Sequence, residues 1–212
     1  MKGRRAWCIV SLLLAFVLGG LTVFMAFTAP ARGTLMLDTD PAAENTARGL
    51  MEAVARGNLE SAGGYILGAP QFTVPDQSRE TAESRLWQYY YDHLTYTLDG
   101  SLYPGKRGLS QDVTVTVPDL KAMTERMGEL APALLTEKIE AADSMEEIYD
   151  GQNGYRQDVT DRVILEAAKK AMEEPETTLE KELTLNLCYV DGRWWVRPDQ
   201  ALLELLSGEL EG

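Results

Sequence analysis

The sequence contains few residues of the types that support metal-based or covalent chemistry. It has one histidine, His93, and two cysteines, Cys8 and Cys188, and Cys8 falls inside an apolar run. One histidine and one remaining cysteine cannot supply a conventional zinc site, and no cysteine pair is left for an intrachain disulfide. We therefore expect no metal centre, assign no cofactor, and exclude the small secreted proteins that disulfides hold together.

Basic residues are also scarce. The 212-residue chain has 20 lysines and arginines against 33 aspartates and glutamates, a formal net charge of −13. Lys2, Arg4 and Arg5 all precede the apolar run, so the rest of the chain carries −16. Phosphate backbones repel a domain with this charge, which argues against nucleic-acid binding. The acidic residues are scattered along the chain, which predicts a solvated acidic surface.

One long stretch lacks charge altogether. Ala6 to Ala29 contains no Asp, Glu, Lys, Arg, His, Asn, Gln or Pro. As a helix, these 24 residues would measure roughly 36 Å, against about 30 Å of bilayer hydrocarbon. We predict a single-pass transmembrane helix over 6–29 that holds the protein in the cell membrane. The basic residues that precede it predict a cytoplasmic tail, 1–5, and an extracytoplasmic C-terminal part.

A cleaved signal peptide is the alternative explanation of this stretch, and it would give a secreted protein. Ala29-Pro30-Ala31 offers small residues at the spacing that a signal peptidase reads. The apolar run is nevertheless longer than the 7–15 residues expected of the apolar h-region of a signal peptide, and Pro30 sits inside the proposed cleavage site. We therefore favour the anchor. Small residues at Ser11, Ala15 and Gly19 could pair two such helices, which would give a weak homodimer.

After a juxtamembrane linker, 30–37, the pattern of residues 38–212 predicts one extracytoplasmic domain. Apolar residues at three- and four-residue spacing predict a helix that starts at Pro41, a short helix capped by Asn58 with Ile66 and Leu67 among its buried positions, and a third helix that ends near Asp92. The period then changes to two, which predicts strands over 94–98 and 112–117, joined through turns in the glycine-rich stretch 99–110.

The second half of the domain begins with a long helical segment, 119–174. Its first helix runs from Asp119 to about Ala142, an acidic loop follows, and a second helix spans Gln157 to Glu173. A strand over 179–190, an Asp191-Gly192 turn and a partner strand over 193–196 form a hairpin before a terminal helix capped by Asp199. The whole order predicts an α+β fold in which a curved antiparallel sheet packs on amphipathic helices.

Two segments resemble a known family. Residues 46–62 (TARGLMEAVARGNLESA) resemble the opening helices of exported bacterial domains of the NTF2-like (cystatin-like, cone-shaped α+β) group, and 183–199 (LTLNLCYVDGRWWVRPD) resemble its last hairpin. The helical segment 119–174 departs from the pattern of this group. The resemblance implies a cone-shaped fold. Some members of the group are isomerases or dehydratases, yet none of their acid–base residues has a match in this sequence.

Aromatic residues supply the candidate site. Trp87, Tyr89, Tyr91, His93 and Trp195 form the predicted ligand-binding set, because aromatic rings offer large contact areas and tyrosine hydroxyls orient a ligand. His93 could also act as a general base with Tyr89 or Tyr91 as proton donor, but packing or capping is the stronger explanation for a lone histidine where a helix gives way to a strand. Tyr89, Tyr90 and Tyr91 are consecutive and cannot all face one side of a helix, so we expect at least one of them to be exposed or at an interface.

Two functional classes remain open from the sequence. The first is a non-catalytic extracytoplasmic domain that binds a partner protein or a small ligand near the membrane. The second is a cone-pocket enzyme, of the isomerase or dehydratase type, that acts on a small molecule. We favour the first, because catalysis requires a positioned base, acid or nucleophile with supporting neighbours, and the sequence shows no such group.

Overall fold

The computed structural model describes residues 41–68, 78–151, 154–174 and 177–209. The predicted tail, membrane helix and linker, residues 1–37, lie outside these ranges. Among the helices that the structure describes, none combines the length and apolar character needed to cross a membrane. The described residues form two compact units. We call 78–89 with 119–177 the helical unit, and 41–68 with 90–118 and 178–209 the sheet unit.

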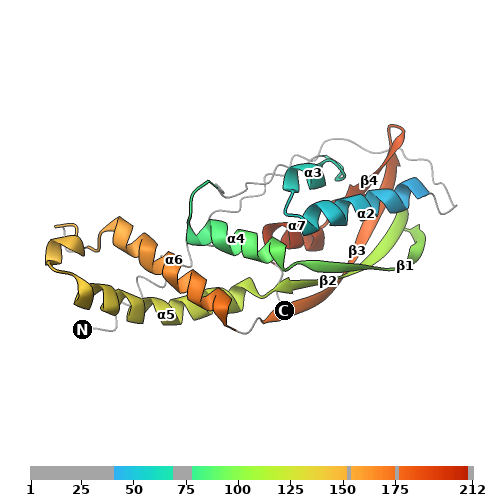
Figure 1. Cartoon of the computed structure of the whole chain (residues 1–212). Coiled ribbons are helices and arrows are strands. Elements are labelled where there is room, and N and C mark those ends of the chain that lie inside the picture. The colour runs from blue at the N-terminus through green and yellow to red at the C-terminus, as the bar shows by residue number, and fades with distance from the viewer. Residues whose placement is uncertain (1–40, 69–77, 152–153, 175–176, 210–212) are drawn as a thin grey trace. The chain divides into compact units, whose positions relative to one another are not determined.

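The sheet unit is built on an open four-stranded antiparallel sheet, in which strands that follow one another in sequence are neighbours in space (Figure 1). The strands are β1 (Thr95–Gly105), β2 (Gly108–Pro118), β3 (Thr178–Val190) and β4 (Arg193–Arg197). The predicted α+β class, both hairpins and the antiparallel sheet are therefore confirmed. Asp191 and Gly192 both have positive φ, as the predicted tight turn between β3 and β4 requires.

Three helices cover one face of this sheet: α2 (Pro41–Ala55), α3 (Leu59–Gly63) and α7 (Gln200–Ser207) (Figure 1). The side chain of Asn58 caps α3 by accepting from the Ser61 amide, and that of Asp199 caps α7 by accepting from the Leu202 amide, as predicted. The strands present alternate residues to these helices. On β2 and β3 the buried residues are mainly aliphatic: Leu109, Val113, Val115, Val117, Leu183, Leu185 and Leu187.

The helical unit pairs α5 (Leu120–Ala141) with α6 (Gln157–Glu173), and a short 3₁₀ turn, Met145–Glu147, lies in the connection between them. The side chain of Asp119 caps α5 by accepting from the Ala122 amide. Both helices confirm the predicted positions, and α5 continues through Pro132. Their shared core contains Leu86, Met123, Met127, Ala131, Leu134, Val163, Ala167, Ala168 and Ala171. Leu86 comes from α4 (Ala82–Asp92), whose residues up to Tyr89 belong to this unit.

One local prediction is wrong, and a second is confirmed only in part. Ile66 and Leu67 are not helical, because they lie beside β4, where the Leu67 amide donates to the Val196 carbonyl and Ile66 forms a parallel bridge. A turn does lie within 99–110, as predicted, but it is confined to residues 106–107, because β1 extends to Gly105 and β2 begins at Gly108. The register shift between Asp99 and Tyr103 absorbs the glycine at position 100, whose φ is +66°, without ending the strand.

Candidate binding surface

The face of the sheet turned away from the helices, which we call the outer face, carries the polar residues of the alternating pattern. Aliphatic residues on β2 and β3 point toward the helices, so the residues between them point the opposite way. The outer face contains Thr97, Asp99, Ser110, Asp112, Thr114, Thr116, Glu180, Glu182, Thr184, Asn186, Trp195 and Arg197. Hydroxyls, amides and carboxylates therefore gather on one side of a rigid sheet.

Asp112 is the centre of this surface. One of its carboxylate oxygens, Oδ1, accepts hydrogen bonds from the hydroxyl of Tyr103 and from that of Thr184, each at 2.8 Å. These contacts join three adjacent strands. The hydrogen bond to the carboxylate is the main cause that raises the pKa of Tyr103. Tyr103 is one of the two large apolar or aromatic side chains that stand out as exposed in the described part, so its ring is held in place while in contact with solvent.

Further polar contacts fix the neighbouring side chains. The hydroxyl of Thr114 donates to Asp99 Oδ2 at 2.6 Å, and the amide of Asn186 donates to Asp199 Oδ2 at 3.3 Å. Behind the face, the buried amide of Gln111 donates to the backbone carbonyls of Asp99 and Asp112 at 2.9 and 3.1 Å. The side chains that make these contacts are therefore held in place before any partner binds.

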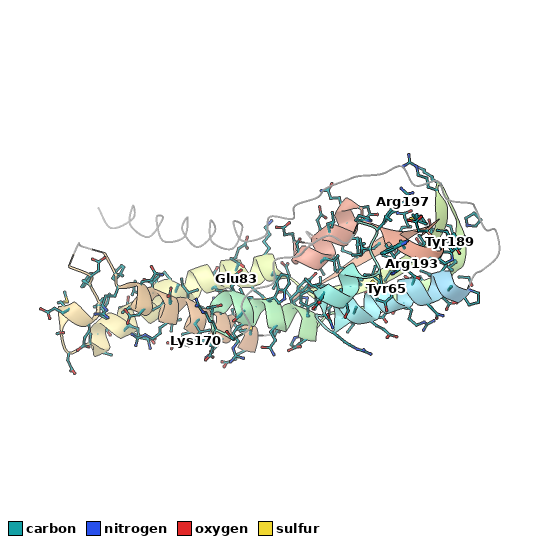
Figure 2. All side chains as sticks on the ribbon, turned by 90° about the horizontal axis from the view of Figure 1, so that it is seen from above. Tyr65, Glu83, Lys170, Tyr189, Arg193 and Arg197 are labelled. Atoms are coloured by element: carbon teal, nitrogen blue, oxygen red, sulfur yellow. The ribbon has the colours of Figure 1, made fainter. Side chains whose placement is uncertain are left out.

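At the β4 end, an arginine covers an aromatic ring. The guanidinium of Arg193 lies 3.7 Å from the ring centroid of Trp195, and the indole of Trp195 donates to the Val190 carbonyl at 3.3 Å. Arg193 also donates to the Gly64 carbonyl. Figure 2 shows Arg193 and Arg197 at this end of the sheet unit. Burial raises the pKa of the neighbouring Cys188 thiol, so this cysteine is not poised as a nucleophile.

The five residues of the predicted ligand-binding set are divided between the two units. Trp87 is buried in the helical unit, where Tyr89 packs half-buried against the α5–α6 core. In the sheet unit, His93 is exposed, while Tyr91 is buried and its hydroxyl donates to the Leu206 carbonyl at 2.7 Å. Trp195 lies on the outer face. Because Tyr91 belongs to the layer of helices, the structure does not bring it together with Trp195.

None of the three consecutive tyrosines is fully exposed. Tyr90 and Tyr91 are 1% and 3% exposed, and Tyr89 is the least buried of the three. Ligand contact by the predicted set remains a prediction. The sequence reasoning missed Tyr103, Asp112 and Thr184 as site residues. The alternation in the DVTVTV segment carried a usable signal, because it places Asp112 and Thr114 on the face opposite the valines.

No Asp, Glu, His, Lys or Arg in the described part of the chain is buried, and the buried titratable groups there are the hydroxyls of Tyr90 and Tyr91 and the thiol of Cys188. Ser84, Ser110, Gln111 and Ser207 are also buried. The same residues include no group of three or more His, Cys, Asp or Glu that could hold a metal ion. The carboxylates, amines, guanidinium groups and imidazole of the described ranges are therefore in contact with solvent.

A concave region lies in the helical unit, where Lys138, Ile148, Arg156, Asp158 and Arg162 line an open depression of about 380 Å³. Its positive charges are already paired. Asp158 contacts both Arg156 and Arg162, at 3.0 and 2.5 Å, and Lys138 lies 3.0 Å from Glu166. With its cations neutralised, this depression has little to select a charged ligand, and the outer face is the better candidate.

Comparisons with known proteins add no family or relative. No family model matches the chain, and no curated protein or solved structure matches it either. The assignment of a function therefore depends on the geometry described above.

Proposed function

We propose that the protein is a non-catalytic, membrane-anchored extracytoplasmic domain that binds a partner protein through the outer face of its sheet. The observation that carries the proposal is the cross-strand network on Asp112, which holds the exposed ring of Tyr103 on a polar surface. Exposed tyrosine on a fixed polar background is typical of protein interfaces, where aromatic residues are enriched. A side chain that is already ordered loses less entropy when it binds.

The charge of this surface selects the chemistry of the partner. Asp99, Asp112, Glu180 and Glu182 lie on the outer face. The register pairs Asp99 with Asp112, and it pairs Glu180 and Glu182 with threonines of β2. Such a surface attracts basic groups and repels anionic lipid and nucleic acid. The partner that we propose is therefore a protein segment with exposed lysine or arginine residues.

A binding role is favoured over catalysis because of what fills the other face. Val113, Leu185 and Val196 are 0–1% exposed beneath the helices, at positions where a cone-pocket enzyme would need room for a substrate. No Asp, Glu, His or Lys of the described ranges is buried there to act as a tuned acid or base.

The proposal also includes an NTF2-like fold for the sheet unit, based on the resemblance of residues 46–62 and 183–199 to that group. We take the sheet unit as the NTF2-like part and the helical segment 119–174 as an insertion between β2 and β3. Residues 119–177 form a compact unit with 78–89 that contains none of the four strands, which supports this division. The membrane anchor remains the segment Ala6 to Ala29, proposed on its length and lack of charge.

The anchor and its orientation are tested by protease treatment and membrane washing. Protease added outside intact, wall-stripped cells should digest the domain, and washing the membranes at high pH should not release it. Release of a fragment that begins near Arg32 would show that a signal peptide had been removed. Protection of the domain from protease would show that the proposed orientation is wrong.

The binding surface is tested by photo-cross-linking in cells. A photoreactive residue at Thr184 should yield a discrete adduct that the double variant Glu180→Lys/Glu182→Lys loses, because the variant reverses the charge beside it. The matched control, Glu137→Lys/Glu140→Lys, makes the same change in net charge on exposed positions of α5 and should keep the adduct. An adduct that both variants retain, or no adduct at all, would contradict the proposal.

A further inference from the structure

The two edges of the sheet differ in whether another segment of the described chain pairs with them. At the β4 edge, residues 64–67 run alongside the strand: the Val196 amide donates to the Tyr65 carbonyl at 2.9 Å, and the Leu67 amide donates to the Val196 carbonyl at 2.8 Å. At the other edge, β1 pairs with β2 on one side and has no strand beside it on the other within the described part of the chain. No residue of β1 is buried, whereas most residues of β2 are.

The first half of this open edge has few of the features that prevent strands from pairing, and Asp99 at its end is its one charged residue. Thr95 to Asp99 pairs with β2 in unbroken register, and the irregularity begins only after Asp99. Proline, lysine and bulges are the features that normally protect an edge. On β1, the bulge and Pro104 fall beyond this segment. Five residues of regularly paired strand are thus left with one row of backbone donors and acceptors directed away from β2.

We propose that this edge pairs with the same edge of a second copy of the chain, in an antiparallel register with its two-fold axis at Thr97. A two-fold interface requires a segment that complements itself. In this register Tyr96 faces Leu98 of the second copy, and Thr95 faces Asp99. Thr97 lies opposite its own equivalent. Aromatic–aliphatic, threonine–threonine and hydroxyl–carboxylate pairs are all favourable across antiparallel strands.

The charges beside the edge do not oppose this pairing. Helix α2 places Arg48, Glu52 and Arg56 near the half-buried Tyr96, whose pKa is raised mainly by this partial burial and is also affected by the three charges. Within α2, Arg48 contacts Glu44 at 2.8 Å and Arg56 lies 3.8 Å from Glu52. Since these charges are paired along the helix, the second copy meets a flank that is close to neutral.

The second copy is favoured as the occupant because the two chains would share one membrane. A pairing of five residues buries less surface than the roughly 1,200 Å² of the smallest stable standard interfaces, so it would be weak between free molecules. Anchors in the same bilayer orient both edges alike and raise their effective concentration. This step rests on the proposed anchor but not on the proposed binding role of the outer face.

Disulfide trapping of the full chain in its native membrane tests the register. Thr97→Cys should give a disulfide-linked dimer under mild oxidation, because directly opposed Cβ atoms lie about 4.5–5.5 Å apart. Thr116→Cys is the matched control: it lies on the same face but one strand further in, and it should remain monomeric like the unmodified chain. A Thr97→Cys chain that reacts with a soluble maleimide but forms no dimer would overturn the proposal, and so would one that does not react.

Charge complementation separates this pairing from nonspecific contact. Thr97→Glu and Thr97→Lys, each alone, place like charges opposite one another, and energy transfer between labelled copies in liposomes should fall to the level of unrelated chains. Mixing the two variants should restore it. Equal transfer in the single and mixed samples would overturn the register. Because the outer-face adduct at Thr184 is measured separately, failure here and failure of the proposed function can be told apart.

Discussion

The hydroxyl of Tyr90, near the end of α4, donates to the backbone carbonyl of Leu205 at 3.0 Å, and this contact joins segments 115 residues apart in sequence. The neighbouring Tyr91 makes the same kind of bond to Leu206 at 2.7 Å. The last carbonyls of a helix have no partner within the helix. The two tyrosines therefore complete the C-terminal capping of α7, to which Gly208 contributes through its left-handed conformation.

The first prediction concerns this capping. Tyr91→Phe should lower the free energy of unfolding by about 1–2 kcal/mol, because the buried Leu206 carbonyl would lose its donor. His93→Ala, two residues away and exposed, should change it by less than about 0.5 kcal/mol. Denaturant titration of the full chain in detergent, followed by tryptophan fluorescence, measures both. A larger effect at His93 than at Tyr91 would contradict the prediction and return attention to a role for the histidine.

The second prediction concerns alkaline pH. Burial raises the pKa of both Tyr90 and Tyr91, and Tyr90 adds to the shift at Tyr91. The folded protein therefore holds these protons more tightly than the unfolded chain, where the pKa of tyrosine is about 10. Their contribution is complete below about pH 10 and is lost as the pH rises above it, by up to about 1.4 kcal/mol per pH unit for each tyrosine.

Unfolding titrations between neutral and strongly alkaline pH test this dependence. The double variant Tyr90→Phe/Tyr91→Phe should be less stable at neutral pH but should lose less stability above pH 10, a comparison that removes the effect of other titrating groups. Parallel slopes for the variant and the unmodified protein would show that these two hydroxyls do not control alkaline unfolding.

The third prediction contrasts two glycines. Gly108, where β2 begins, has φ of +156°, and a Cβ there would collide with the Leu187 carbonyl oxygen on β3. Gly108→Ala should therefore destabilise the protein by more than about 2 kcal/mol. Gly128, inside α5, has nothing within 4 Å of such a Cβ. Gly128→Ala should stabilise it by about 0.5–1 kcal/mol, because alanine favours helix. Thermal unfolding of both variants measures these changes. A Gly108→Ala variant that is more stable than the unmodified protein, or a Gly128→Ala variant that is less stable, would contradict the prediction.

The fourth prediction tests the network on the outer face. Asp112→Asn should lower the pKa of Tyr103 toward its ordinary value, because the hydrogen-bonded carboxylate is the main cause of its elevation. Tyrosinate absorbance, compared between Asp112→Asn and Asp112→Asn/Tyr103→Phe, isolates this hydroxyl. Thr160→Ala, on α6, serves as a control that should leave the titration unchanged. An unaltered Tyr103 pKa in the Asp112 variant would mean that the contact is not maintained in solution.

Much of the local structure followed from residue patterns. The bounds of α6, the caps supplied by Asn58, Asp119 and Asp199, and the Asp191-Gly192 turn were predicted because each depends on side chains within a few positions of one another. The length of β1 was not predicted. Glycine and proline at 100–105 suggested turns, and only pairing with β2 shows that a bulge can carry the strand through them.

The sequence by itself determined the α+β class and the division of the β2 and β3 residues between two faces, since period-two alternation leaves one choice once the apolar face is buried. It also determined the charge of the domain. Tertiary structure alone decided which polar residues meet. Tyr103 of β1 and Thr184 of β3 both donate to Asp112 on the strand between them, and the tyrosines of α4 donate to the end of α7. Register and packing bring these positions together, and no local sequence pattern relates them.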